Sequence, residues 1–162
     1  MPDGEAGELY SCNAQTFDGY WKLPEKTRKA FRGDYCTVGD LARRDEDGFI
    51  HLVDRKSNMV ISGGENVYPS EVESILGGHP KIRDVAVIGV ADPKWGERVH
   101  AVIIAHDGAS LTQDEVIEWS RDKIAGYKRP RSISVIADHE MPRTATGKIL
   151  HRVLRDRFSG KV

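Results

Sequence analysis

The sequence predicts an α+β protein with a β-rich first part, residues 1–54, and a mixed second part, residues 55–162. In the first part, apolar stretches are short and broken by turn residues, and no periodic run is long enough for a major helix. In the second part, strand and helix signals alternate. The polar run from Asp54 to Asn58 separates these two patterns and is the expected boundary.

The composition is that of an ordinary globular protein, with 39% hydrophobic and 30% charged residues. No apolar run approaches the ~20 residues that span a bilayer, and the chain does not start with a basic stretch followed by an apolar one. We therefore expect no transmembrane segment and a cytoplasmic location. The two cysteines and six scattered histidines lack the spacing of metal ligands, so no metal site is expected.

The charge is unevenly distributed along the chain. Residues 1–119 hold 13 Lys and Arg against 21 Asp and Glu, whereas residues 120–162 hold 11 against 4. The basic end suggests a phosphate-bearing partner, either a nucleic acid or a nucleotide, but on charge alone an ordinary solvated helix face is the favoured interpretation. A nucleic acid is disfavoured because the basic residues lack interleaved aromatic residues and no nucleic-acid motif occurs.

The first elements of the chain are strands. Leu41–Val53 is predicted to form a hairpin, because the turn residues Asp45-Glu46-Asp47-Gly48 divide two arms of high β-propensity. Met59–Ile61 is predicted to be a strand, followed by a loop at 62–66.

A helix follows, with Ser70 and Glu73 as its capping box and an end at Gly77-Gly78. Residues 84–90 and 99–105 are predicted to be paired strands on either side of a turn.

The last elements repeat the alternation. Thr112 and Glu115 form a second capping box and open a helix that ends near Gly126. Residues 132–136 are predicted to be a strand, and residues 149–158 a helix with one apolar face. We expect the helices to pack on a three-stranded sheet.

Three loops carry the candidate chemistry. Thr37-Val38-Gly39-Asp40 places a carboxylate beside a glycine, where it can accept two hydroxyl hydrogen bonds. Ser62-Gly63-Gly64-Glu65-Asn66 leaves room beside its backbone, and Pro142–Lys148 places a lysine just before a helix. Taken singly, each is more often an ordinary turn or a solvated lysine.

Taken together, the loops resemble a known family. Residues 54–73 and 142–148 resemble the signatures of acyl-CoA synthetases in the adenylate-forming, or AMP-binding, superfamily. The resemblance covers nearly the whole chain, and the Ser-Gly-Gly-Glu-Asn-Val-Tyr-Pro form is similar to the acyl- and aryl-CoA ligase branch. Further matches lie at Gly7-Glu8-Leu9, Gly19-Tyr20-Trp21, Pro24-Glu25, Gly39-Asp40, Asp47-Gly48, Gly96-Glu97 and Tyr127-Lys128-Arg129-Pro130.

The resemblance implies a two-step reaction. A carboxylate attacks the α-phosphate of ATP to give an acyl-adenylate and pyrophosphate, and the thiol of coenzyme A then displaces AMP. The implied substrates are ATP, coenzyme A and a carboxylic acid, with a fatty acid as our expectation from the branch. Mg²⁺ accompanies ATP, with no protein ligand assigned in this chain. Residues 1–54 correspond to the β-rich end of the large AMP-binding domain, and residues 55–162 to a small C-terminal lid that rotates between the steps.

The resemblance also implies roles for single residues. Lys148 is the catalytic residue, whose ammonium offsets negative charge at the α-phosphate. Asp40 and Arg55 bind the nucleotide at its ribose and phosphates. Ser57 occupies the hinge position, where Asp or Lys is common in the family. The family usually has Thr where this chain has Val38.

Coenzyme A is implied to meet two further groups of residues. Gly63, Gly64 and Glu65 enter the active site in the second step, and the missing side chains leave a slot for the pantetheine arm. Lys128, Arg129 and Arg131 are implied to meet the phosphates of coenzyme A, with a solvated loop as the alternative for this cluster. We expect Gly63-Gly64 at a hairpin-like tip and Lys148 exposed on a loop or a first helical turn.

The family's phosphate loop, adenine-binding segment and acyl pocket do not occur in these residues. The chain alone is therefore expected to be inactive, with the N-terminal domain of the same enzyme as its partner. The alternative is a stand-alone, non-catalytic lid that binds a nucleotide, coenzyme A or a partner domain, as the initiator-like Met1 suggests. We expect residues 1–54 to expose apolar surface.

Overall fold

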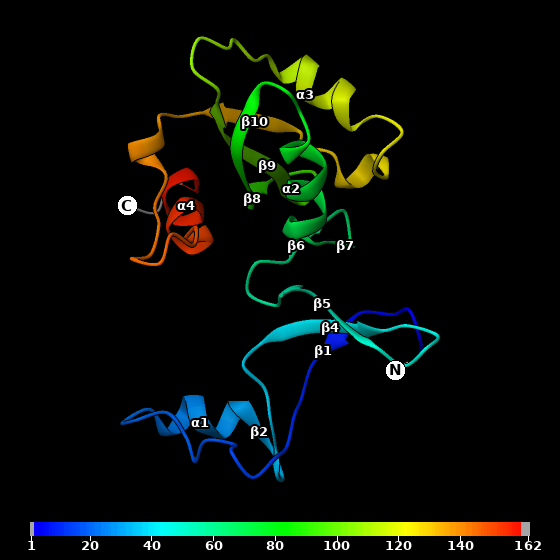
Figure 1. Ribbon diagram of the computed structural model, residues 1–162, viewed down its shortest axis with the longest axis vertical. Helices are drawn as coiled ribbons and strands as arrows, with labels where there is room; N and C mark the ends of the chain where they lie inside the picture. Colours follow the sequence, from blue (N-terminus) through cyan, green and yellow to red (C-terminus); the bar gives the residue numbers. More distant parts are fainter. Residues whose placement is uncertain (1, 160–162) are drawn as a thin grey trace. The chain divides into compact units, whose positions relative to one another are not determined.

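The computed structural model describes residues 2–159; Met1, which motivated the stand-alone alternative, lies outside them. The chain divides into two compact units, unit 1 up to Ser57 and unit 2 from Asn58 (Figure 1). Unit 1 contains mostly short strands, and unit 2 packs helices on a mixed sheet. The predicted α+β class is therefore confirmed.

Unit 1 is built on an antiparallel sheet in the order β1 (Gly7–Glu8), β4 (Asp40–Arg44), β5 (Ile50–Arg55). β4 and β5 form the hairpin predicted at 41–53, and its turn is closed by Asp45, whose Oδ1 accepts hydrogen bonds from the backbone N–H groups of Asp47 and Phe49. The remaining elements are α1 (Pro24–Ala30), β2 (Phe31–Arg32) and β3 (Tyr35–Cys36).

Unit 1 exposes large apolar side chains, as expected. Trp21 is 86% exposed, and Leu52, on the edge strand β5, is 67% exposed. The others are Leu23, Tyr35, Val38, Phe49 and Ile50.

The sheet of unit 2 is centred on one long hairpin. β8 (Ile82–Asp92) pairs antiparallel with β9 (Gly96–Ala105) over almost its whole length. β10 (Ser132–Val135) runs parallel to β9. β8, β9 and β10 correspond to the strands predicted at 84–90, 99–105 and 132–136.

The expectation of only three strands is wrong, because two more extend the sheet to five. β6 (Val60–Ser62) joins β9 through the pairing of Ser62 with Gly96, and β7 (Glu65–Val67) returns along β6. The glycines between β6 and β7 reverse the chain tightly enough for this return, so both strands can continue the sheet.

Both faces of the β8–β9 hairpin are buried under helices. α2 (Pro69–Gly77) and α3 (Gln113–Ser120) cover one face, and α4 (His151–Phe158) covers the other (Figure 1). Successive strand residues point to opposite faces, so both sets are apolar and buried. The first core contains Val72, Leu76, Val85, Val87, Val99, Ala101, Ile103 and Val116. The second contains Ala86, Ile88, Val90, Val102, Ile104, Met141 and Leu154. Two 3-10 turns, Gly126–Lys128 and Asp138–Glu140, complete unit 2.

One of the two predicted capping boxes is formed. The Thr112 hydroxyl accepts from the N–H of Glu115, and the Glu115 carboxylate accepts from the N–H of Thr112. Lys81, whose ammonium lies 2.6 Å from Glu115, and the Thr112 N–H together lower the pKa of Glu115 to about 2.

The other predicted capping box, Ser70 with Glu73, is wrong. α2 starts with Pro69 at its first turn and has Tyr68 as its N-cap, with no side-chain cap. The Glu73 carboxylate instead accepts a hydrogen bond of 2.8 Å from the backbone N–H of Val87 in β8. A tertiary contact has replaced the local one.

His100 is buried between the sheet and α4. Its ring lies against Phe158, with ring centroids 5.0 Å apart, and its Nδ1 is 2.7 Å from the hydroxyl of Ser132. Burial, and secondarily the charge of Arg98, lowers the pKa of His100 to about 4. The folded state therefore excludes a proton that the unfolded chain takes up at pH 6.5 and below, and stability is lost as the pH falls below 6.5.

We predict that His100→Leu flattens the pH dependence of stability of unit 2. Lowering the pH from 7 to 5 should reduce the unfolding free energy of the original chain by about 2 kcal/mol through His100. The variant has no imidazole at this position and should not show this reduction. The measurement is urea unfolding at both pH values, followed through the NMR signals of β9 amides. Equal pH dependence in the two proteins would contradict the assignment.

Candidate functional site

Asp40 and Arg55 face each other in unit 1. They are a cross-strand pair of the β4–β5 ladder, and the Arg55 Nε lies 3.1 Å from the Asp40 Oδ1. Gly39, with φ +84°, shapes the turn into β4, and its carbonyl accepts from the N–H of Lys56. The two residues expected to bind the nucleotide thus present a carboxylate and a guanidinium at one end of a hairpin.

The hydroxyl of Thr37 supports the same turn. It accepts a 3.0 Å hydrogen bond from the Gly39 N–H, and the side chain of Thr37 is buried. The threonine that lies one place earlier than in the family pattern is therefore used to hold the backbone before Asp40, while Val38 between them is exposed.

Gly63 and Gly64 form the tip of the β6–β7 hairpin, as predicted. Their φ values of +63° and +87° are those of a type I′ turn, which requires two left-handed residues. The Gly63 N–H donates to the carbonyl of Trp95 at 2.9 Å. A Cβ on Gly63 would lie 2.9 Å from the Trp95 ring, so the absent side chain lets the indole pack directly on the backbone.

The Trp95 ring lies between the glycine tip and the side chain of Arg131. The Arg131 guanidinium carbon lies 4.1 Å from the centroid of the Trp95 ring. The Nε of Arg131 is buried and has no hydrogen-bond partner within residues 2–159. The turn that carries Trp95 is held by Asp92, whose Oδ1 accepts from Lys94 N–H and Trp95 N–H, and these contacts, the first above all, lower the pKa of Asp92.

The packing of Trp95 against the glycine tip is not predicted by the sequence analysis. The sequence predicts the run Asp92-Pro93-Lys94-Trp95-Gly96 only as a turn between two strands. A large aromatic residue in a tight polar turn was the available signal, because such a side chain needs an apolar partner. That partner, Gly63, lies 32 positions earlier, and nothing local indicates it.

Lys128 and Arg129 lie at a 3-10 turn beside α2. The Lys128 ammonium binds both carboxylate oxygens of Glu71, at 2.7 and 2.8 Å, and the Arg129 Nε donates to the carbonyl of Ile124. The Lys128 side chain is only 18% exposed. A phosphate at this position would compete with Glu71 for Lys128, so the coenzyme A role of these two residues stays a prediction.

Lys148 is exposed on a loop, as predicted, three positions before α4 begins. Its N–H donates to the Thr144 hydroxyl at 3.1 Å, and its carbonyl accepts from the Thr144 N–H at 2.8 Å. The backbone of Lys148 is thus tied into a tight hairpin while its side chain faces solvent. Lys148 leads into α4 on one face of the sheet, whereas Lys128 contacts α2 on the other.

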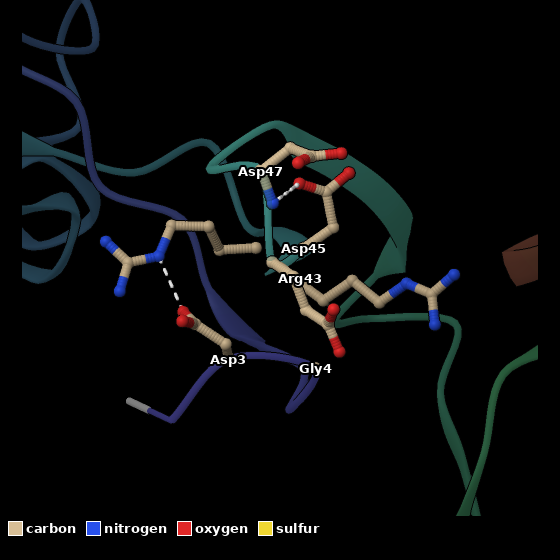
Figure 2. A pocket seen from close by; sticks show the side chains of 7 residues that line it. Asp3, Gly4, Arg43, Asp45 and Asp47 are labelled. Atoms are coloured by element: carbon tan, nitrogen blue, oxygen red, sulfur yellow. Dashed lines mark hydrogen bonds and ion pairs between the residues drawn. The ribbon is translucent and has the colours of Figure 1, made fainter.

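A separate hollow lies at the β4–β5 turn of unit 1 (Figure 2). Its charged groups already have partners: the Arg44 Nε lies 2.7 Å from the Asp3 Oδ1, and the Asp45 Oδ2 lies 2.5 Å from the His51 Nε2. None of the predicted site residues lines it. Its lining residues are Asp3, Gly4, Arg43, Arg44, Asp45, Glu46 and Asp47.

Residues 2–159 contain no group of three or more His, Cys, Asp or Glu side chains placed to hold a metal ion. Within the same residues, no helix has the length and apolarity needed to cross a membrane. Ser57, expected at the hinge, is the last residue of unit 1, and unit 2 starts at the next position.

The segment from α2 to Lys148 matches a known family model. Residues 71–148 match the AMP-binding enzyme C-terminal domain. These residues form an AMP-binding enzyme C-terminal domain. Lys148 is the last residue of the matched segment, and Lys128 and Arg129 lie within it.

Similarity to two curated relatives extends over almost the whole chain. A feruloyl-CoA synthase of Amycolatopsis is 44% identical over 98% of this chain and 32% of its own length. A long-chain-fatty-acid–CoA ligase of Mycobacterium tuberculosis is 43% identical over 88% of this chain and 28% of its own length. The chain therefore spans about a third of the length of these relatives.

A solved structure supports the same relationship. The structure of ATP-bound MatB from Rhodopseudomonas palustris superposes with a TM-score of 0.90 at 36% identity, covering 98% of this chain and 31% of MatB. The fold found here for both units is thus that of part of an adenylate-forming enzyme.

We predict that Gly63→Ala destabilises unit 2 more than Gly64→Ala does. Both substitutions place alanine at positive φ, at a cost of about 1 kcal/mol each. Only the Gly63 methyl also meets the Trp95 ring, whereas a Cβ on Gly64 has nothing within 4 Å. The added contact should cost a further ~1 kcal/mol, measured by urea unfolding of unit 2. If the two variants lose the same unfolding free energy, the Trp95 indole moves aside at no energetic cost and the prediction is wrong.

Proposed function

We propose that the chain is the C-terminal part of an ATP-dependent carboxylate–CoA ligase, which forms an acyl-adenylate and then a coenzyme A thioester. The observation that carries the proposal is Lys148, exposed at a hairpin of fixed backbone at the end of an AMP-binding enzyme C-terminal domain. The substrates proposed are ATP, coenzyme A and a carboxylic acid, with Mg²⁺ bound to ATP. Two relatives are named as a CoA synthase and a CoA ligase, and a similar enzyme has been solved with ATP bound, which supports this choice.

In the first step, the carboxylate oxygen attacks the α-phosphorus of ATP and pyrophosphate leaves. Negative charge accumulates around this phosphorus, and the Lys148 ammonium offsets it without any change of its own protonation. The exposure of Lys148 suits this role, because an ammonium paired within its own domain would not be available to a phosphate.

Asp40 and Arg55 are proposed to hold the nucleotide during this step. The Asp40 carboxylate accepts hydrogen bonds from the ribose hydroxyls, and the Arg55 guanidinium provides fixed positive donors. Their cross-strand pairing keeps the two side chains at one spacing, so the nucleotide meets a preset pair of groups.

In the second step, the thiol of coenzyme A attacks the acyl carbonyl and AMP leaves. The Gly63–Gly64 tip is proposed to pass close to the pantetheine arm, since neither residue has a side chain to block it. The Trp95 indole behind Gly63 offers an apolar wall to the same arm.

We further propose that the acid is a fatty acid and that an N-terminal domain completes the site. The Mycobacterium relative is named for long-chain fatty acids, whereas the Amycolatopsis relative is named for an aromatic acid, so an acid panel must contain both classes. The N-terminal domain corresponds to the two thirds of each relative that this chain does not cover.

We predict that Lys148→Ala lowers acid-dependent pyrophosphate release by the complete enzyme about 100-fold or more, because a charge that stabilises the transition state is lost. Thioester formation from supplied acyl-adenylate and coenzyme A should change by less than about threefold. Lys123→Ala is the matched control, since Lys123 is exposed on unit 2 and lies over the Trp119 ring. A Lys148→Ala enzyme that releases pyrophosphate at the original rate would refute the proposal.

We also predict that the 162-residue chain alone releases no pyrophosphate with ATP, Mg²⁺ and a panel of short, long and aromatic acids. Acid-dependent release would show that a complete site lies within this chain and would overturn the assigned division of roles. Calorimetry with ATP and coenzyme A on the same sample tests the stand-alone binding alternative, which requires binding of at least one of them.

A further inference from the structure

The lysine hairpin, residues 142–150, fixes its own backbone. The Gly147 N–H donates to the Thr144 carbonyl at 2.9 Å, and the Leu150 N–H donates to the Pro142 carbonyl at 2.9 Å. With the two Thr144–Lys148 hydrogen bonds, these contacts set the shape of the hairpin. Where Lys148 lies relative to the rest of unit 2 then depends on what holds the hairpin in place.

One end of the hairpin is held through Arg143. Its guanidinium donates to the Asp84 carboxylate from Nη2, and to the Gly147 carbonyl from Nη1 at 3.2 Å. Asp84 belongs to β8, and its Oδ1 accepts a 2.8 Å hydrogen bond from the Val85 N–H. A continuous chain of contacts therefore joins β8 to the residue next to Lys148.

The other end is held through His151, the first residue of α4. Its Nε2 lies 2.7 Å from the Glu73 Oε1, which also accepts the hydrogen bond from the Val87 N–H at 2.8 Å. The side chains of Glu73 and His151 are only 23% and 18% exposed. This contact joins α2, β8 and α4.

The two carboxylates are located by the same strand. Val85 and Val87 are two residues apart in β8, so their N–H groups lie along one strand edge about 7 Å apart. Their side chains are buried in the core under α2, which keeps this part of β8 in place. Two acceptors at a fixed spacing thus receive two donors, Arg143 and His151, that flank Lys148.

We propose that Asp84 and Glu73 are positioning residues: through Arg143 and His151 they hold the lysine hairpin against β8 and so set where Lys148 lies for the adenylate-forming step. This inference rests on the proposed function of Lys148. Neither carboxylate touches a substrate in it. Partly exposed ion pairs add little to global stability, whereas a shift of 1 Å in a reacting group lowers rates up to about 100-fold.

The first test uses the chain itself and its amide hydrogen exchange. Arg143→Met and His151→Phe keep the bulk of each side chain and remove its contacts to the carboxylates. Exchange at the N–H groups of Gly147, Lys148 and Leu150 should become about tenfold faster, with β9 amides unchanged. The matched control is Arg121→Met, which breaks the 2.8 Å pair of Arg121 with Glu118 on α3. Unchanged exchange in the hairpin would overturn the proposal.

The second test uses the complete enzyme and measures the two half-reactions separately. Arg143→Met should lower adenylate formation about tenfold through kcat, with thioester formation from supplied acyl-adenylate within twofold. Arg143→Lys, which keeps one charged donor for Asp84, should recover part of the loss. Equal losses in both half-reactions would indicate a purely structural role and overturn the proposal. If a variant at Arg143 does not fold, Asp84→Asn provides the same comparison.

The two hypotheses fail in different ways. If Lys148→Ala leaves adenylate formation intact while the Arg143 variant accelerates hairpin exchange, the proposed function is wrong and the hairpin attachment stands. If Lys148→Ala abolishes adenylate formation while the Arg143 and His151 variants change neither exchange nor rate, the positioning role is wrong and the proposed function stands.

Discussion

Unit 2 depends on the burial of the β8–β9 hairpin on both of its faces. Residues 85–90 of β8 are all buried, so the strand has no side that can face water. Each face must be covered, and short amphipathic helices cover them: α2 and α3 on one side, α4 on the other. Helices of eight or nine residues are marginal by themselves, so their stability comes from this packing.

The same hairpin places the chemistry of unit 2. Trp95 lies in the turn between β8 and β9, and the glycine tip packs on its ring. The lysine hairpin is attached to the amide groups of β8 through Asp84 and Glu73. Trp95 and Lys148 both lie in surface loops, but both loops are joined directly to the buried strands β8 and β9. This attachment lets a surface loop hold a side chain at a constant position.

Local signals in the sequence predicted the local structure well. The glycine pair predicted a tip, Thr112 and Glu115 predicted a cap, and the Asp-Gly turn predicted the β4–β5 hairpin, because each depends only on neighbouring residues. The motif order also led to the family.

Non-local contacts were not predictable in the same way. Glu73 was assigned to a helix cap, but a partner in β8 and a partner 78 positions later compete for its carboxylate. The sequence around Lys128 indicates no partner for its ammonium, because that partner, Glu71, lies 57 positions earlier and is brought beside it only by the fold. Hydrophobic periodicity specifies which face is buried and says nothing about which charged groups the packing brings together.

The two carboxylates that accept from β8 amide groups also affect how one chain can associate with another copy of itself. Among the described strands β8 pairs only with β9, so its other side has no strand partner, and unpaired strand edges are where strands from neighbouring chains can add. Glu73 occupies the Val87 amide and Asp84 the Val85 amide, so an incoming strand would find two of its donors taken and negative charge beside them. The side chains that hold the lysine hairpin thus also occupy two backbone donors along the edge of a long apolar strand, and covering edge donors with charged groups is one way proteins limit edge-to-edge pairing.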